Sequence, residues 1–287
     1  MDDAYSNTLV NAGILAAHLH DPAWVVLDCR ASLADPAAAR AAYAAGHVPG
    51  ARHADLERDL SGPHGTGAGR HPWPDAASFA ARLGAWGVTP AHQVVAYDAG
   101  DGAFAARAWC LLHLLGHARV AVLDGGWARW QALGLPVDDA LPVAAKVAYA
   151  PEHGVAFDAA RLLDADQVAT HLAAGGLLLD ARAGERFRGE VEPIDRIAGH
   201  VPGAVNRPYA ENLAEGRFKP REALAADFST LLAGRAPDAV VAMCGSGVTA
   251  CHHLLAMEHA GLPGAKLYMG SWSGWIEDRS RPVSSDP

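Results

Sequence analysis

The feature of this sequence that most restricts its fold is an internal duplication. Four blocks occur twice and in the same order: 25–30 with 177–182, 45–51 with 198–204, 93–98 with 239–244, and 122–127 with 267–272. The second pair is identical, AGHVPGA in both copies. The two copies lie much further apart than the period of about 20 to 50 residues that marks a solenoid. The sequence therefore predicts two similar domains.

Each half alternates short apolar runs with helical patterns. Strands are expected at 24–28, 93–97 and 119–123, and again at 177–180, 239–243 and 265–268. Helices are expected at 8–19, 75–85 and 103–115, and again at 158–174, 221–233 and 248–260. This alternation predicts an α/β fold, with a parallel sheet in each domain and helices on both of its faces.

The domain boundaries follow from the repeat and from proline placement. We expect one domain at 1–135 and a second at 156–287. Between them, residues 136–155 contain prolines and little periodicity, which is typical of a linker. Two domains that cover each other favour a monomer.

Composition excludes several classes of function. A net charge of −9 argues against nucleic acid and against an anionic membrane surface as partners, although a local basic pocket still permits an anionic substrate. No run approaches the roughly 18 apolar residues of a membrane span. The four cysteines form no disulfide framework, and the acidic N-terminus lacks the basic start of a signal peptide. A cytoplasmic protein is expected.

The two halves differ where the strand at 239–243 ends. The second half has Cys244 there, and the first half has Asp98. In open α/β sheets this end of a strand is where ligands bind. The glycine-containing loop after Cys244 leads into a helix, whose first N–H groups are unpaired and favour a thiolate. The sequence thus predicts a nucleophilic Cys244, and a non-catalytic first domain because an aspartate cannot act as a sulfur nucleophile.

The sequence supports neither a cysteine-phosphatase site nor a metal site. Cysteine phosphatases place an arginine six residues after the cysteine, but Ala250 stands there, so phosphate would lack its bidentate partner. His252 and His253 are neighbours on a predicted helix and point in different directions, which disfavours a metal site. No metal or cofactor is expected.

The repeated Asp-x-Arg, Gly-His-Val-Pro-Gly-Ala, cysteine-loop and Gly-x-Trp blocks resemble the tandem-domain rhodanese superfamily over nearly the whole chain. The loop CGSGVTA at 244–250 is similar to that of 3-mercaptopyruvate sulfurtransferases, whereas thiosulfate sulfurtransferases usually have Cys-Arg-Lys-Gly-Val-Thr. The resemblance implies two rhodanese-like domains and a ping-pong reaction. In it, Cys244 takes sulfur from 3-mercaptopyruvate as a persulfide and passes it to a thiol such as thioredoxin or a small thiol. Two alternatives remain: thiosulfate as the donor, and a persulfide carrier without its own small-molecule donor.

The resemblance also implies a relay that handles the proton of the donor. Its members would be Ser246, His71 and Glu57. The loop between Glu57 and His71 is long and rich in glycine, so Asp55 or His64 remain alternatives.

A substrate carboxylate would be bound by Arg186, which matches the carboxylate-binding arginine of the family. A second arginine usually follows Glu-Pro in these enzymes. Here Ile194 follows Glu-Pro, the nearest arginine is Arg196, and Arg188 is the next candidate. The backbone of the loop would complete the substrate site, through Gly245, Gly247, Val248 and Thr249.

Overall fold

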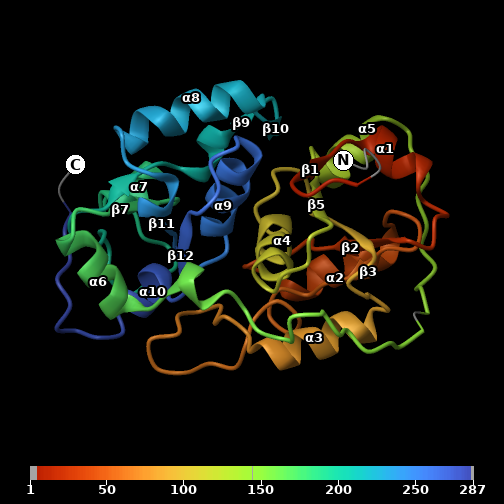
Figure 1. The fold of residues 1–287 in the computed structure, drawn as a ribbon, viewed down its shortest axis with the longest axis horizontal. Coiled ribbons are helices and arrows are strands. Elements are labelled where there is room, and N and C mark those ends of the chain that lie inside the picture. Colours follow the sequence, from red (N-terminus) through yellow and green to blue (C-terminus); the bar gives the residue numbers. More distant parts are fainter. Residues whose placement is uncertain (1–4, 144, 286–287) are drawn as a thin grey trace. The chain divides into compact units, whose positions relative to one another are not determined.

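The computed structural model describes residues 5–143 and 145–285 of the chain. By its internal contacts the chain forms two compact units (Figure 1). The first contains the chain up to Ser61, Pro74–Asp158 and Glu215–Phe218. The second contains Gly62–Trp73, Ala159–Ala214 and the chain from Lys219 onward. The segment 62–73 therefore packs with the second unit, although it lies inside the first sequence repeat.

Each unit is built on a five-stranded parallel sheet, and the order of the strands is the same in both. The first sheet has the order β1-β5-β4-β2-β3, with strands β1 (Leu9–Val10), β2 (Trp24–Asp28), β3 (Arg52–His53), β4 (Gln93–Tyr97) and β5 (Val120–Leu123). The second has the order β6-β12-β11-β7-β8, with strands β6 (Leu162–Leu163), β7 (Leu177–Asp180), β8 (Val205–Asn206), β11 (Val240–Met243) and β12 (Lys266–Tyr268). Counted within its own unit, each sheet reads 1-5-4-2-3, which confirms the predicted duplication and the α/β class.

Helices surround both sheets. Those of the first unit are α1 (Ala12–Ala17), α2 (Pro36–Ala45), α3 (Ala76–Ala85), α4 (Ala105–Leu114) and α5 (Gly126–Ala132). Those of the second are α6 (Ala165–Ala173), α7 (Gly184–Phe187), α8 (Arg221–Leu232), α9 (Ala250–His259) and α10 (Ser271–Trp275). The remaining elements are short: strands β9 (Leu213–Ala214) and β10 (Arg217–Phe218), and 3-10 turns at Ala159–Arg161, Tyr209–Asn212 and Pro237–Ala239. Within the described ranges, no helix combines the length and apolar character that crossing a membrane requires.

The apolar core of the second unit shows how the sheet is covered. On one side, Val168 of α6 and Trp272 of α10 pack with strand residues such as Met243. Helix α9 packs against β11 and β12, and α8 packs against α9. The first unit has an equivalent core, in which α1 and α5 cover β2, β4 and β5. Strand β11, which Cys244 follows directly, therefore lies in the middle of a sheet with helices on both faces.

The predicted opening helices are wrong at their first residues. Residues 9–10 and 162–163 are edge strands, β1 and β6, and the helices begin only at Ala12 and Ala165. Leu9 aligns with Val122 of β5, so a partner more than a hundred residues away satisfies its backbone. No pattern in the neighbouring sequence predicts this long-range strand pairing. Helix α2 lies outside the predicted elements, although the Asp35 side chain caps it and proline opens it.

The repeated blocks perform the same structural task in both units. Asp180 accepts hydrogen bonds from Nε and Nη2 of Arg182, and Nη2 also donates to the carbonyl of Gly199 in the Gly-His-Val-Pro-Gly turn. The Asp28–Arg30 pair makes the same contacts with the first copy of that turn. The turn histidines bind backbone carbonyls through Nδ1, as His200 does at Phe187. These motifs join a strand end to a turn.

The predicted linker at 136–155 forms no helix or strand in its described part, and its contacts place it with the first unit. Asp138 forms an isolated bridge with His47. The domain boundaries expected from the sequence remain predictions.

Candidate active site

Cys244 lies at the carboxyl end of β11, between the last residue of the strand and the loop that leads into α9. Its N–H donates to Oγ of Ser271 at 3.1 Å, and its carbonyl accepts from the N–H of Trp272 at 2.9 Å. The next carbonyl, of Gly245, accepts from Ser273 N–H at 2.9 Å. The start of α10 thus holds the base of the loop, and the Cys244 side chain is buried.

The loop after Cys244 contains backbone N–H groups that the rest of the described chain does not engage. Within the part of the chain that the structure describes, no hydrogen bond engages the N–H groups of Gly245, Ser246, Val248 or Thr249. Gly247 has a φ of 77°, the left-handed region that favours glycine and lets the loop turn into α9. N–H groups that converge at the start of a helix stabilise an anion. The loop is therefore suited to an anionic sulfur on Cys244.

The first unit shows what the equivalent loop binds. Asp98, which occupies the place of Cys244, is buried, and its carboxylate accepts hydrogen bonds from four backbone N–H groups. The donors belong to the residues that lead into α4: Gly100, Gly102, Phe104 and Ala105. In the first unit this loop thus encloses a carboxyl group supplied by the chain itself.

Ser246 and His71 form a hydrogen-bonded pair beside the cysteine. The Ser246 Oγ lies 2.7 Å from Nδ1 of His71, and both residues are buried. The sequence proposed both for one relay, and the structure brings them together. Their separation of 175 positions along the chain is bridged because segment 62–73 packs on the second unit.

Glycines allow that segment to approach α10 closely. A Cβ on Gly69, whose φ is 74°, would lie 2.4 Å from the carbonyl oxygen of Gly270. A Cβ on Gly274 would lie 2.5 Å from the carbonyl oxygen of Gly67. The N–H of Arg70 donates to Oγ of Ser273 at 3.0 Å. The glycine-rich stretch, which the sequence marks only as a long loop, is thus a close contact that positions His71.

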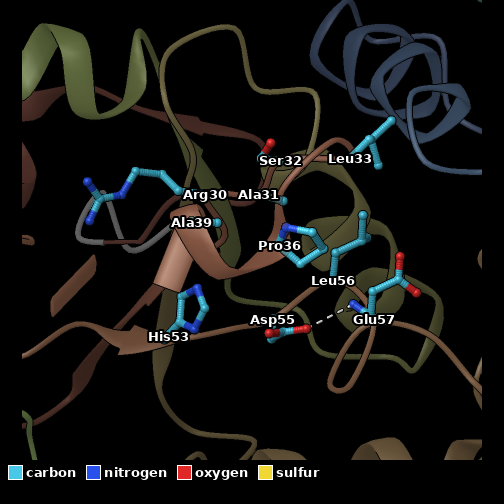
Figure 2. A pocket seen from close by; sticks show the side chains of 10 residues that line it. All are labelled: Arg30, Ala31, Ser32, Leu33, Pro36, Ala39, His53, Asp55, Leu56 and Glu57. Atoms are coloured by element: carbon cyan, nitrogen blue, oxygen red, sulfur yellow. Dashed lines mark hydrogen bonds between the residues drawn. The ribbon is translucent and has the colours of Figure 1, made fainter. Parts of the chain in front are cut away.

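The acidic candidates for the relay lie in the first unit. Figure 2 shows Asp55 and Glu57 lining a small pocket with Arg30 and His53. The N–H of Glu57 donates to Oδ1 of Asp55 at 3.1 Å. The Asp55 carboxylate also pairs with Arg40 and Arg58. These contacts engage Asp55 in the structure of its own loop.

Arg186, on α7, lies over the cysteine loop. Its Nη1 and Nη2 are each 3.6 Å from the position that a Cβ on Gly245 would occupy. The guanidinium donates to Glu192 from Nε at 3.2 Å and from Nη2 at 2.7 Å, and Nη2 also lies 3.3 Å from Asp195. Burial tends to raise the pKa of Glu192, but hydrogen bonds from Arg186 and from the N–H groups of Asp195 and Ile194 hold this pKa below its usual value. Arg186 is therefore fixed by carboxylates on one side and faces the loop on the other.

The two other arginines proposed from the sequence donate to groups outside the cysteine loop. Arg196 donates from Nη2 to the carbonyls of Ile276 and Glu277 after α10. Arg188 forms an exposed pair with Glu190 at 2.7 Å. Among the described residues, neither guanidinium hydrogen-bonds to the cysteine loop.

Arg70 was not predicted for the site, yet it contacts the loop. Its Nη2 is 3.1 Å from the Cβ position of Gly245. The only signal in the sequence is that Arg70 precedes His71, because nothing local shows which way its side chain points.

Comparison with known proteins agrees with this architecture. The model of the rhodanese-like domain family matches residues 11–133 and 164–278, once in each repeat. Two parallel sheets in the same order, with a cysteine loop after the central strand of the second, define a tandem sulfurtransferase-type fold, and the chain belongs to the rhodanese-like family. The family match confirms the resemblance drawn from the sequence.

Individual relatives carry more specific names. The chain is 51% identical over 284 residues to a probable 3-mercaptopyruvate sulfurtransferase of Pseudomonas aeruginosa, with 98% of this chain and 99% of the relative covered. It is 40% identical over 289 residues to a putative thiosulfate sulfurtransferase of Mycobacterium tuberculosis, with 98% of both chains covered. The crystal structure of the 3-mercaptopyruvate sulfurtransferase SseA of Escherichia coli is 32% identical and superimposes with a TM-score of 0.77, over 93% of this chain and 100% of that one.

Proposed function

We propose that this chain is a sulfurtransferase that takes sulfur from 3-mercaptopyruvate through a persulfide on Cys244 and passes it to a thiol. The observation that carries this proposal is the hydrogen bond of 2.7 Å between Ser246 and His71, directly beside the cysteine loop. A serine and a histidine in contact can transfer a proton, and the enolate of pyruvate, which leaves through carbon, must be protonated. The relatives named for this activity, at 51% and 32% identity, support the same assignment.

The first half-reaction forms the persulfide. The Cys244 thiolate attacks the sulfur of mercaptopyruvate, an S–S bond forms, and the bond between sulfur and carbon breaks. Its electron pair leaves with the carbon as the enolate of pyruvate. The proton of the donor thiol then passes to that carbon, and Ser246 with His71 is placed to carry it. The products are pyruvate and a persulfide anion, which N–H groups of the loop such as those of Gly245 and Ser246 stabilise.

The second half-reaction returns the enzyme to its starting state. The thiolate of the acceptor attacks the outer sulfur of the persulfide, and the Cys244 thiolate leaves. The acceptor departs as a persulfide, so no redox cofactor takes part in the cycle. A thiol such as thioredoxin or a small thiol is the proposed acceptor, and we propose that the protein works as a monomer in the cytoplasm, where such thiols stay reduced.

The donor is tested by steady-state rates with mercaptopyruvate and with thiosulfate, each with the same thiol acceptor. We expect a higher kcat/KM for mercaptopyruvate, because the loop after Cys244 contains Ser246 and no arginine or lysine to bind the second anionic group of thiosulfate. A higher kcat/KM for thiosulfate would instead assign the activity for which the mycobacterial relative is named. A persulfide carrier would turn over neither donor.

Replacing Arg186 by alanine should raise KM for mercaptopyruvate. A charge-assisted hydrogen bond contributes about 1.5–3 kcal/mol, so we expect kcat/KM to fall roughly 10- to 150-fold. Arg235→Ala serves as a surface control, because among the described residues its exposed guanidinium donates only to the backbone carbonyls of Gly175 and Leu232. An unchanged KM in Arg186→Ala, or the same increase in Arg188→Ala, would remove Arg186 from the carboxylate site.

Breaking the Ser246–His71 pair should lower kcat for mercaptopyruvate. General acid–base catalysis typically contributes about 10²–10⁴ in rate, so we expect losses of at least roughly a hundredfold in Ser246→Ala and in His71→Gln. Thiosulfate should be less affected in both variants, because sulfite leaves without needing a proton.

Variants of the alternative relay residues are compared with the Ser246 and His71 variants. His64→Gln and Asp55→Asn should retain kcat, whereas Glu57→Gln should reduce it. The relay assignment is wrong if His64→Gln loses activity while His71→Gln retains it.

A further inference from the structure

The second unit has a hollow with a basic lining beside the end of α10, called here the basic hollow. Its volume is about 550 Å³, and three of the four charged residues that line it are arginines: Arg196, Arg279 and Arg281. The fourth is Asp278. The whole chain has a net charge of −9, so this lining is opposite in sign to the protein around it. A local excess of positive charge of this kind attracts anions.

Two of the three arginines have a charge that no carboxylate of the described chain neutralises. Arg279 is exposed and forms no ion pair within the described ranges. Arg196 donates only to backbone carbonyls. Arg281, in contrast, is paired, because its Nη2 donates to Asp166 at 2.8 Å and its Nε lies 3.7 Å from Asp278. A ligand would therefore find Arg279 and Arg196 still able to bind an anionic group.

The rest of the basic hollow is apolar. Ile197, Ile276 and Val283 complete its lining, and the side chain of Val283 is exposed. Sites for small organic molecules usually have volumes of about 300–1,000 Å³, an apolar lining and a few charged groups that fix the orientation of the ligand. The size and lining of this hollow therefore fit an organic anion better than a single inorganic ion.

A second hollow joins the basic hollow to the cysteine loop. It has a volume of about 350 Å³, and Arg196 and Ile276 line both hollows. Ser273 also lines the second hollow, and its N–H donates to the carbonyl of Gly245, the residue after Cys244, at 2.9 Å. Ser273 and Ile276 are three positions apart at the end of α10, which is about 4.5 Å along a helix. The basic hollow is thus close to the cysteine loop along this path.

The proposed reaction needs a second substrate that brings a thiolate to the persulfide. An extended chain of three residues spans up to about 10 Å, which exceeds the rise between Ser273 and Ile276. A peptide thiol of this size could therefore keep a terminal carboxylate at Arg279 while its central sulfur approaches the loop.

We propose that the basic hollow binds the carboxylates of the sulfur acceptor, and that this acceptor is a small peptide thiol with carboxylates at its ends. The inference rests on the proposed function and deepens its second half-reaction. The acceptor thiol first loses its proton to solvent, and its thiolate attacks the outer sulfur of the persulfide. A bond forms between these two sulfur atoms, and the bond from the outer sulfur to Cys244 breaks. The electron pair of that bond stays on Cys244 as its thiolate, so no oxidant or reductant is needed.

The test compares two acceptors with mercaptopyruvate held at saturation. Glutathione is the probe with two carboxylates, and 2-mercaptoethanol is the neutral thiol. We expect Arg279→Gln to raise KM for glutathione roughly three- to fivefold and Arg279→Glu to raise it roughly tenfold, because the first removes an attraction and the second adds a repulsion. KM for 2-mercaptoethanol and kcat with either acceptor should stay within about twofold of wild type.

A variant of opposite sign strengthens the test. Asp278→Asn removes the only carboxylate of the lining, and an asparagine can still accept the N–H of Ser280 as Oδ1 of Asp278 does. This variant should lower KM for glutathione roughly twofold. Arg235→Gln is the matched control, because it removes an exposed arginine that does not line the hollow. Raising the ionic strength should increase KM for glutathione in wild type and less so in Arg279→Gln.

The first half-reaction separates this inference from the proposed function. Mercaptopyruvate without acceptor should load one sulfur atom onto wild type and onto Arg279→Glu at equal rates, measured by intact-mass spectrometry. A wild type that acquires no sulfur contradicts the proposed function itself. If wild type is loaded, the acceptor site is wrong when Arg279→Glu leaves KM for glutathione unchanged or raises it equally for both acceptors. It is also wrong if only KM for thioredoxin responds, because the hollow would then be a docking surface for a protein.

Discussion

Replacing Cys244 by serine is expected to abolish sulfur transfer from either donor, with a loss of roughly a thousandfold or more. A hydroxyl at this position cannot form a persulfide, so the first half-reaction has no covalent product. The loop would still present its N–H groups and the Ser246–His71 pair would remain, but neither can replace the sulfur nucleophile. Only background reactions of the donor with the acceptor should be left.

The intermediate provides a second measurement. Intact-mass spectrometry after treatment with mercaptopyruvate, without acceptor, should show one added sulfur atom per chain in wild type and none in Cys244→Ser. Cys251→Ser is the matched control, because the Cys251 Sγ donates to the carbonyl of Gly247 at 3.3 Å and a hydroxyl can make the same bond. Pyruvate release by Cys244→Ser at the wild-type rate would reject the persulfide mechanism.

Replacing Asp98 by alanine is expected to destabilise the first unit by about 3 kcal/mol or more. Four backbone N–H groups would lose their acceptor in a buried loop, and each unsatisfied group costs about 1–3 kcal/mol. Part of this loss is offset. Burial raises the pKa of Asp98, as does the nearby Asp101, against the lowering effect of the N–H groups, so the wild-type carboxylate is itself costly to bury.

Urea unfolding measures this effect as a lower midpoint, provided that the slope of the transition is unchanged. Asp101→Ala is the control. Because Asp101 is only partly buried, we expect its free energy of unfolding to fall by less than about 1 kcal/mol. A change of less than about 0.5 kcal/mol in Asp98→Ala would show that water or loop rearrangement replaces the carboxylate. The aspartate would then not be the anion that holds this loop together.

Much of the fold was predictable because its signals are local. The apolar runs of β2, β4, β7 and β11 lie in the middle of their sheets, where both faces are covered, so they read as nearly continuous hydrophobic segments. The edge strands β1 and β6 are two residues long and exist only through pairing with distant strands. Such elements have no periodicity of their own, so they were assigned to the helices that follow them.

The candidate site likewise combines residues that the local sequence predicted with residues that it did not. Cys244 and its loop were found because a strand, a glycine turn and a helix start follow one another along the chain. The contacts of Arg70 with Asp195 and with Gly245 span 125 and 175 positions, and no neighbouring residue signals them. Arg196 was proposed because it is close in sequence to Ile194, but its guanidinium points to the carbonyls that follow α10.

By itself, then, the sequence determined the duplication, the parallel α/β sheets and the reactive cysteine, since each depends on the order and spacing of residues within a single element or repeat. Only the tertiary structure decided that segment 62–73 packs with the second unit, where His71 meets Ser246 and Arg70 faces Gly245. The physical reason is that side-chain direction at a distant contact depends on the path of the whole chain. Here that path is set by close backbone packing at Gly69 and Gly274.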